Sequence, residues 1–166
     1  ALKAFIPGGA SAPWFYEEHL DIPLEKGTVD RAGSMLGSGA VVVMDETTDA
    51  VKACLNVVRF FAHESCGKCT PCREGTTWLE RILTRIDRGA GVRTDLELLL
   101  DVCDNISPGV TWPPKQTTIC PLGPSAVSPI ASALQRFRPE FEARIEAAVR
   151  ERQTTHVGLP KVTSHV

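Results

Sequence analysis

The spacing of hydrophobic and polar positions changes near residue 46 of this chain. Before it, short apolar runs such as Leu2 to Ile6 and Ala40 to Met44 are separated by turns rich in glycine and proline. Runs of this length between turn residues are typical of β-strands. We therefore expect residues 1–46 to form a small β-containing domain.

Beyond residue 46 the apolar residues recur at helical spacing, and five helices are predicted. Polar residues 45–49 can cap the first, which should run from about 48 to 63, and Gly89 suits the end of the second. Thr94 and Glu97 form a capping box for the third. The apolar faces are Val51, Cys54, Leu55, Val58 and Phe61; Leu79, Ile82, Leu83 and Ile86; Leu96, Leu99, Leu100 and Cys103; Val127, Ile130, Ala131, Leu134 and Phe137; and Phe141, Ile145 and Val149.

Two segments of the second half do not fit a helix. Residues 106–118 contain three prolines and a glycine, which predicts an ordered loop leading to Cys120. Pro129 is tolerable in the first turn of the fourth helix, where we expect it. Residues 153–166 lack an apolar face and are expected to form a flexible tail after a helical domain at 47–152. The fold class predicted is α+β.

Four cysteines are the strongest candidates for a functional site. Cys66, Cys69 and Cys72 have C-x2-C-x2-C spacing within Glu-Ser-Cys-Gly-Lys-Cys-Thr-Pro-Cys-Arg-Glu-Gly, and Cys120 lies downstream before a proline. Three closely spaced thiolates can bind three corners of a cubane while a distant cysteine binds the fourth. The pattern therefore predicts a [4Fe-4S] cluster with these four ligands.

Two other interpretations of the four cysteines remain open. Four thiolates can also hold a structural zinc ion, although zinc sites usually consist of two separated C-x2-C pairs. A thiol of Cys66 or Cys69 could act as a nucleophile, but the βαβ pattern around a redox C-x2-C motif is missing. The remaining two cysteines, Cys54 and Cys103, fall on apolar helix faces and are expected to be buried core residues.

Composition narrows the environment and the partners. The 166 residues carry a net charge of -2 with six cysteines, which gives no electrostatic reason to expect nucleic acid as a partner. No apolar run is long enough to cross a membrane, so any membrane association would come through partner subunits. The first residues do not read as a secretory signal, and three cysteines within seven residues favour a reducing, cytosolic setting.

Both cysteine motifs resemble those of one family. The run from Glu64 to Thr76, and Thr-Thr-Ile-Cys-Pro-Leu-Gly-Pro-Ser-Ala around Cys120, are similar to the NADH-binding 51-kDa or F subunit of respiratory complex I. Residues 34–46 and 4–13 resemble parts of the soluble-ligand-binding β-grasp domain of that family. The resemblance extends over nearly the whole chain.

The resemblance implies a role in electron transfer. It assigns the cluster to Cys66, Cys69, Cys72 and Cys120 in a helical bundle, and residues 1–46 to a partial β-grasp domain. In the family, NADH reduces FMN, and the cluster accepts electrons from the flavin. Nothing in this chain resembles the glycine-rich segments that bind FMN and NADH, so this segment is expected to relay electrons without catalysing hydride transfer.

The same resemblance suggests partners and a location. The implied neighbours are other peripheral-arm subunits of complex I, especially the E-type [2Fe-2S] subunit and the G-type iron-sulfur subunit, on the cytoplasmic face of the inner membrane. The diaphorase subunits of NAD-reducing hydrogenases and NAD-dependent formate dehydrogenases share the cysteine pattern and are the first alternative. A zinc-stabilised module that docks subunits is the second, and a small thiol enzyme is the third.

Overall fold

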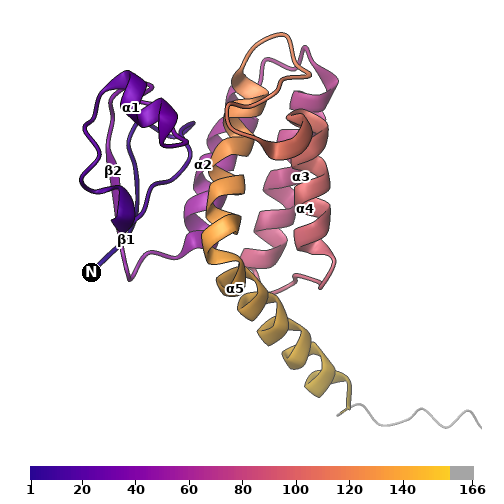
Figure 1. The fold of residues 1–166 in the computed structure, drawn as a ribbon. Coiled ribbons are helices and arrows are strands. Elements are labelled where there is room, and N and C mark those ends of the chain that lie inside the picture. The colour runs from indigo at the N-terminus through magenta and orange to yellow at the C-terminus, as the bar shows by residue number, and fades with distance from the viewer. Residues whose placement is uncertain (158–166) are drawn as a thin grey trace, which may run out of the picture.

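A computed structural model describes residues 1–157 of the chain. A two-stranded sheet and its connecting segments lie beside a group of packed helices (Figure 1), so the predicted α+β class is confirmed. The elements in chain order are β1 (Leu2–Ile6), η1 (Glu17–His19), α1 (Lys26–Arg31), β2 (Val42–Asp45), α2 (Ala50–Glu64), α3 (Thr70–Asp87), α4 (Asp95–Ile106), η2 (Pro108–Val110) and α5 (Leu122–Val157).

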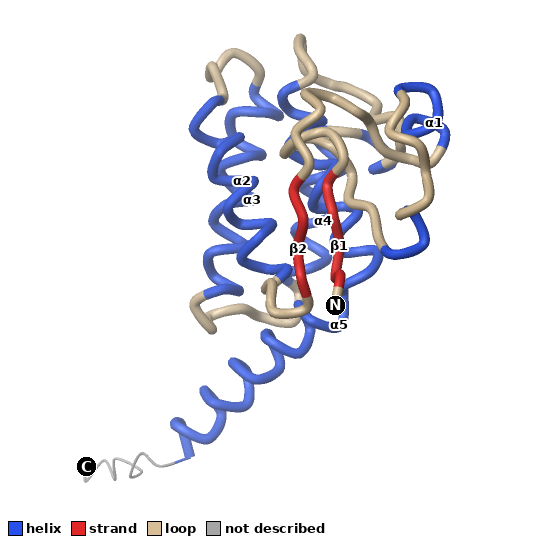
Figure 2. Tube along the Cα trace, turned by 90° about the vertical axis from the view of Figure 1, so that its left-hand side faces the viewer, coloured by secondary structure: helices blue, strands red, loops and turns tan. Residues whose placement is uncertain are grey.

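The two strands pair in antiparallel orientation and lie side by side in Figure 2. Phe5 is opposite Val43 in the register, and its backbone also exchanges hydrogen bonds of 2.8 and 2.7 Å with Phe15. The first strand has the predicted bounds, whereas the second begins two residues later than the apolar run. The reason is that Ala40 instead accepts a hydrogen bond from Gly9, across the turn that precedes the strand.

Two glycines allow the backbone of the β-containing region to cross itself closely. A Cβ atom on Gly8 would lie 2.0 Å from the carbonyl oxygen of Met35, and one on Gly37 would lie 2.1 Å from the carbonyl oxygen of Gly8. Gly37 also has φ of +47°, which favours glycine. Any larger residue at either position would push two backbone segments apart.

The four long helices pack against one another and against the sheet region. α2 contacts α3 and α5, and α4 contacts α3 and α5. Ala4, Ile6 and Trp14 from the first 46 residues join the same buried cluster as these helices. Burial of one continuous apolar core is the main driving force that holds the two regions together. The largest fully buried side chains are Phe141, Leu55, Leu79, Leu83, Ile86, Leu99, Ile106, Ile130, Val29, Val51, Val58 and Val127.

A partly buried network of charges also joins three of the helices. Arg144 on α5 forms ion pairs with Asp49 and with Asp87, the latter at 2.9 Å. Asp49 precedes α2, and its carboxylate accepts the backbone N–H of Lys52 at 3.1 Å. This cap explains why α2 begins within two residues of its predicted start.

The helix α3 begins earlier than predicted, inside the cysteine triplet. It starts at Thr70 rather than close to Leu79, and Pro71 occupies its first turn. Proline suits this position because the first N–H groups of a helix have no partner within it, and its fixed φ is already helical. Pro71 therefore lies in the helix and not in the segment before it.

The predictions for the third, fourth and fifth helices need correction. Thr94 does precede α4, but its side chain makes no capping hydrogen bond. Instead, Asp95 accepts the backbone N–H of Val92 at 2.9 Å. The predicted fourth and fifth helices form one helix, α5, bent where Phe137 has non-helical φ and ψ. Pro139 contributes to the bend because it has no N–H for the turn before it.

The ends of α5 also differ from the sequence prediction. The helix begins at Leu122, so Pro129 lies inside it rather than in its first turn, and it continues to Val157. The helix thus continues into the tail predicted at 153–166, and residues 158–166 lie outside the described residues. The last turns of α5 extend away from the other helices (Figure 1). No helix in the described range has both the length and the apolarity needed to span a bilayer.

Candidate metal centre

The cysteine triplet joins the end of α2 to the start of α3. Cys66 is exposed on the connecting segment, Cys69 is the residue directly before α3, and Cys72 is buried in the first turn of that helix. The three thiols therefore differ in exposure and in backbone setting. The early start of α3 fixes Cys72 to a rigid element, which a loop would not have done.

Arg73 stabilises the conformation of this connecting segment. Its Nη1 donates a hydrogen bond of 2.9 Å to the carbonyl oxygen of Gly67, which has φ of +77°. Its Nε pairs with Glu74 at 2.7 Å. Because Arg73 lies on α3, the hydrogen bond links the chain between Cys66 and Cys69 to the helix. Arg73 thus has a structural contact, in addition to any effect of its charge.

The second cysteine motif lies against the first. The backbone N–H of Ile119 donates to the Sγ of Cys69 at 3.3 Å. The Thr118 hydroxyl donates to the carbonyl oxygen of Cys120 at 2.7 Å and holds the chain just before α5. The structure therefore brings the segment carrying Cys120 beside Cys69.

One side-chain hydroxyl also contacts a thiol of the triplet. Ser65 Oγ lies 3.4 Å from the Sγ of Cys72. Both groups carry a proton in the neutral state, and either can be the donor. When Cys72 is deprotonated, the hydroxyl of Ser65 must donate, because a thiolate has no proton to give.

Two helix N-termini meet at these cysteines and favour negative charge there. α3 begins directly after Cys69, and α5 begins two residues after Cys120. The first N–H groups of a helix lack partners within it and carry the positive end of its dipole. Thiolates and a negatively charged cluster are stabilised by such an environment.

The family model for the NADH-ubiquinone oxidoreductase-F iron-sulfur binding region matches residues 52–144, which include both cysteine motifs. This chain belongs to that family.

Relatives named as F subunits match most of this chain. The F subunit of NADH-quinone oxidoreductase from Streptomyces coelicolor is 49% identical over 144 residues, which is 87% of this chain and 30% of that protein. Its counterpart from Mycobacterium tuberculosis is 46% identical, over 87% of this chain and 31% of that protein. The chain thus spans about a third of the length of these relatives and corresponds to the iron-sulfur part of the F subunit.

The fold of this chain is similar to that of part of a protein of known structure. One chain of an NAD+-reducing [NiFe]-hydrogenase in the H2-reduced state superposes with a TM-score of 0.73 and 28% sequence identity. The match covers 100% of this chain and 29% of the hydrogenase chain. The arrangement of strands and helices is therefore shared between this chain and part of a hydrogenase.

The cofactor of this iron-sulfur region is a [4Fe-4S] cluster. Thiolate sulfur is the donor that such clusters require, and the segments around Cys69 and Cys120 contain thiols beside two helix N-termini. Four thiolates on one zinc ion would stand about 3.8 Å apart, from a Zn–S bond of about 2.3 Å. Within residues 1–157, no three His, Cys, Asp or Glu side chains are gathered for a single ion. The described structure therefore does not gather the thiols at one point, and the fit to a cluster rests on the chemistry of the thiolate donors.

The other two cysteines lie in the core, as predicted. Cys54 on α2 and Cys103 on α4 are both 0% exposed. Burial raises the pKa of Cys103 to about 12, and the nearby charge of Asp104 adds to the rise. Burial also raises the pKa of the Cys54 thiol, with a further contribution from Cys103. Both therefore remain neutral thiols at physiological pH.

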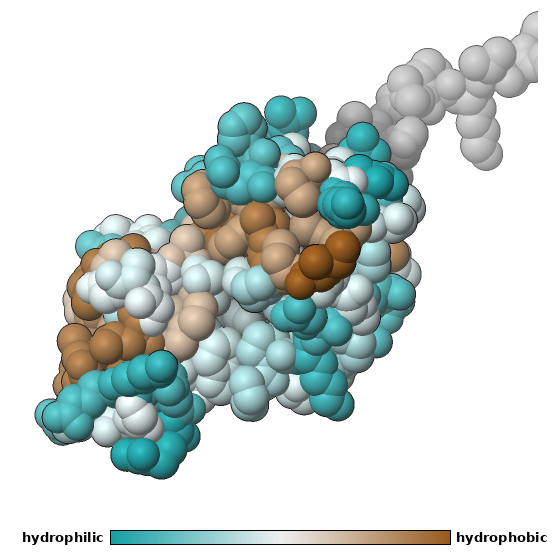
Figure 3. Space-filling view, turned by 90° about the horizontal axis from the view of Figure 1, so that it is seen from above, coloured by the Kyte–Doolittle hydropathy of each residue, from teal (hydrophilic) through white to brown (hydrophobic). Residues whose placement is uncertain are grey.

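The surface beside the cysteines is apolar and hollowed. Figure 3, which looks down on this end of the helices, shows apolar side chains gathered in its middle. Phe60 and Ile119 have exposed fractions of 53% and 75%. An open hollow of about 470 Å³ adjoins Cys120 and is lined partly by Phe60, Phe61 and Pro121. Exposed apolar area of this kind is typical of a surface that another protein region covers.

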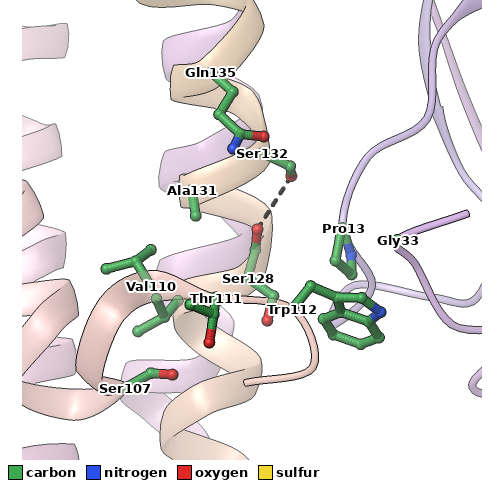
Figure 4. A pocket seen from close by; sticks show the side chains of 11 residues that line it. Pro13, Gly33, Ser107, Val110, Thr111, Trp112, Ser128, Ala131, Ser132 and Gln135 are labelled. Carbon is green, nitrogen blue, oxygen red and sulfur yellow. Dashed lines mark hydrogen bonds between the residues drawn. The ribbon is translucent and has the colours of Figure 1, made fainter. Parts of the chain in front are cut away.

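A second, smaller cavity lies where the loop before Cys120 meets α5 (Figure 4). Its volume is about 90 Å³, and its walls include Ser107, Val110, Ser128 and Ser132. The Ser132 hydroxyl is already bonded to the Ser128 carbonyl at 3.1 Å. Sites for nucleotide-sized ligands are usually at least about 300 Å³, so this cavity is too small for a flavin or a dinucleotide.

Sequence reasoning missed several residues that shape the centre. It predicted none of the contacts made by Arg73, Ser65 and Ile119. The Ser65 contact crosses from the end of one helix to the start of the next. No local pattern reports such a contact, although Ser65 directly precedes the triplet.

Proposed function

We propose that this chain is the electron-relay part of an F-type NADH:quinone oxidoreductase subunit, with Cys66, Cys69, Cys72 and Cys120 as ligands of one [4Fe-4S] cluster. The observation that carries the proposal is the hydrogen bond of 3.3 Å from Ile119 to Cys69, which brings the two cysteine motifs of this family together. The cluster supplies one-electron chemistry when bound.

The residues of this chain would hold and shield the centre. Cys72 and the core beneath it limit access of water from the helix side, and Arg73 fixes the segment between Cys66 and Cys69. The partial positive charge of the two helix N-termini would favour the negatively charged thiolates. No acid or base is needed, because electron transfer through this part requires no proton transfer by a side chain.

The remaining parts of the reaction are inferred from the related F subunits. FMN and NADH would be bound by the parent subunit outside this segment, and FMN reduced by NADH would donate electrons to the cluster. Since the relatives are about three times longer than the matched part, they have room for such a region. The apolar surface around Phe60 and Ile119 is where another part of the complex would be packed.

The finer architecture and the partners belong to the same proposal. Residues 1–46 would be a partial β-grasp domain and residues 47–152 an iron-sulfur-binding helical bundle. The E-type [2Fe-2S] and G-type iron-sulfur subunits would be the neighbours, at the cytoplasmic face of the inner membrane, with membrane contact only through partner subunits.

A second candidate function is supported by the structural match. The chain would then be the equivalent part of a diaphorase subunit, as in an NAD+-reducing hydrogenase. The cluster and its four ligands would be the same in both cases. The two functions differ in the complex that assembles around the subunit, so purification of the native complex separates them.

The test is electron paramagnetic resonance on the anaerobically reconstituted, dithionite-reduced chain, with iron, sulfide and zinc measured on the same sample. We expect a reduced [4Fe-4S] signal with about four irons and four sulfides per chain. Stoichiometric zinc without a signal would instead show a structural docking module. Reactive thiols in the loaded protein would point to a thiol enzyme.

A further inference from the structure

The hydroxyl at the end of α2 faces a buried thiol on α3. Ser65 follows the last residue of α2, where φ of −63° and ψ of 119° turn the chain out of the helix. Its Oγ lies 3.4 Å from the Sγ of Cys72. This distance is within the range for a hydrogen bond that involves sulfur. The contact thus places a side-chain donor on one of the four cysteines.

The direction of this hydrogen bond is fixed once a metal is bound. A cysteine that ligates iron is a thiolate and has no proton. The Ser65 hydroxyl is therefore the donor in the loaded chain, and its O–H dipole points at the sulfur. Cys72 is only 6% exposed, so water has little access to replace this donor. Hydrogen bonds are stronger in such surroundings than at the surface.

We propose that Ser65 raises the reduction potential of the cluster through its hydrogen bond to Cys72. The inference rests on the proposed ligation by Cys72. One electron entering the cluster adds one negative charge, which is shared with the thiolate sulfurs; no bond is broken and no proton is transferred. A donor to the sulfur stabilises the reduced state more than the oxidised one. Ser65 is a positioning residue in this sense, because it acts through Cys72.

The other donors at the centre cannot be adjusted in the same way. Ile119 donates to Cys69 through its backbone N–H, which most substitutions leave in place. Cys66 and Cys120 are exposed, so solvent can donate to their sulfurs. Ser65 is therefore the position where a change of side chain should alter the potential with the least disturbance of the backbone.

The experiment is a redox titration of the full chain after anaerobic reconstitution, with dithionite as reductant and the paramagnetic signal as readout. Ser65→Ala should retain the iron and sulfide content of the unsubstituted chain. Its equilibrium constant for reduction should fall by about tenfold, which is a decrease of about 59 mV for a one-electron couple. The potential is measured directly, so the readout does not depend on turnover.

Three variants control for effects of structure. Ser65→Thr keeps the hydroxyl and should retain the potential, whereas Ser65→Val has the same shape as that threonine without the hydroxyl and should match Ser65→Ala. Thr77→Ala removes an exposed hydroxyl on α3 that donates to the Arg73 carbonyl at 3.0 Å and forms no hydrogen bond with a cysteine in the described structure. Thr77→Ala should leave the potential unchanged.

Each outcome decides the proposal. An unchanged potential in fully loaded Ser65→Ala would overturn it. If Ser65→Ala and Ser65→Val both lose iron while Ser65→Thr keeps it, Ser65 serves cluster retention and the proposal is wrong. If Cys72→Ser keeps a full cluster with an unchanged signal, the proposed ligand set itself fails, which distinguishes that error from one about Ser65.

Discussion

Ile119 donates its backbone N–H to the Sγ of Cys69 across 3.3 Å, although 50 positions separate the two residues in the chain. One partner directly precedes α3, and the other lies three residues before α5. The contact therefore links the starts of two helices. It also places Cys120, the next residue after Ile119, at the same end of the molecule as the triplet.

The first prediction concerns the ligand assignment. Cys120→Ser should reduce the iron content from about four to about three or fewer atoms per chain, because an alkoxide is a poorer iron ligand than a thiolate. Iron and sulfide analysis with electron paramagnetic resonance measures the loss. Cys103→Ser is the matched control, since this thiol is buried in the core, and it should keep the full iron content. Equal iron loss from both variants would contradict the assignment.

The second prediction concerns the ion pair of a buried aspartate at the start of α4. The Asp95 side chain is 1% exposed, and its carboxylate accepts the Arg85 Nε at 3.0 Å and the backbone N–H of Val92 at 2.9 Å. Asp95→Ala should lower the free energy of unfolding by about 2–3 kcal/mol, because these donors lose their acceptor. Urea unfolding measures the change. The exposed Asp101→Ala on the same helix should stay within about 0.5 kcal/mol, and a similar loss in both would refute the explanation.

The third prediction tests the close backbone crossing. Gly8→Ala places a Cβ atom 2.0 Å from the Met35 carbonyl oxygen, which belongs to the backbone and cannot rotate away. The free energy of unfolding should fall by about 2–4 kcal/mol. Gly27→Ala is the control, because its Cβ would meet only the mobile end of Arg31 at 3.3 Å within α1. That variant should be neutral or more stable by up to about 1 kcal/mol; a neutral Gly8→Ala would argue against the crossing.

The fourth prediction is a loss of stability at alkaline pH. The pKa of Cys103 is raised to about 12 and that of Cys54 is also raised, both chiefly by burial. The folded thiols therefore stay protonated above pH 9, whereas the unfolded ones ionise near pH 8.5. The contribution of each thiol to stability is complete below that value, and it falls by about 1.4 kcal/mol per pH unit above it.

Urea unfolding between pH 8 and 10.5 measures this dependence. The double variant Cys54→Ala, Cys103→Ala lacks both thiols and should lose stability less steeply as the pH rises, whatever its stability at pH 8. An identical slope in the variant and the unsubstituted chain would show that the two thiols do not contribute.

The sequence predicted some elements well because their signals are local. α2 has both a capping aspartate, Asp49, and a regular apolar face. The start of α3 was missed because Cys72 and Thr76, which are buried on its first turns, are not strongly apolar residues. Two separate helices were predicted where α5 only bends, because packing decides whether a helix continues past a proline such as Pro139.

The four ligands of the centre stay a prediction from the sequence, whereas the contacts around them come only from the structure. The spacing of the triplet and of Cys120 indicates sulfur ligands, because thiolate chemistry needs those residues. The contacts of Ser65 with Cys72 and of Arg73 with Gly67 arise only after the helices pack. Tertiary hydrogen bonds of this kind leave no periodic pattern in a single sequence.

The distance along the chain between the two cysteine motifs has a consequence for the degradation of the protein as well as for its function. A cluster bound to both would act as a cross-link across about fifty residues, and closing a loop of that length removes enough chain entropy from the unfolded state to stabilise the fold by about 4 kcal/mol. Oxidative destruction of the cluster would then interrupt electron transfer and remove this cross-link at the same time. Damaged copies would unfold more readily than intact ones, and proteases would remove them first.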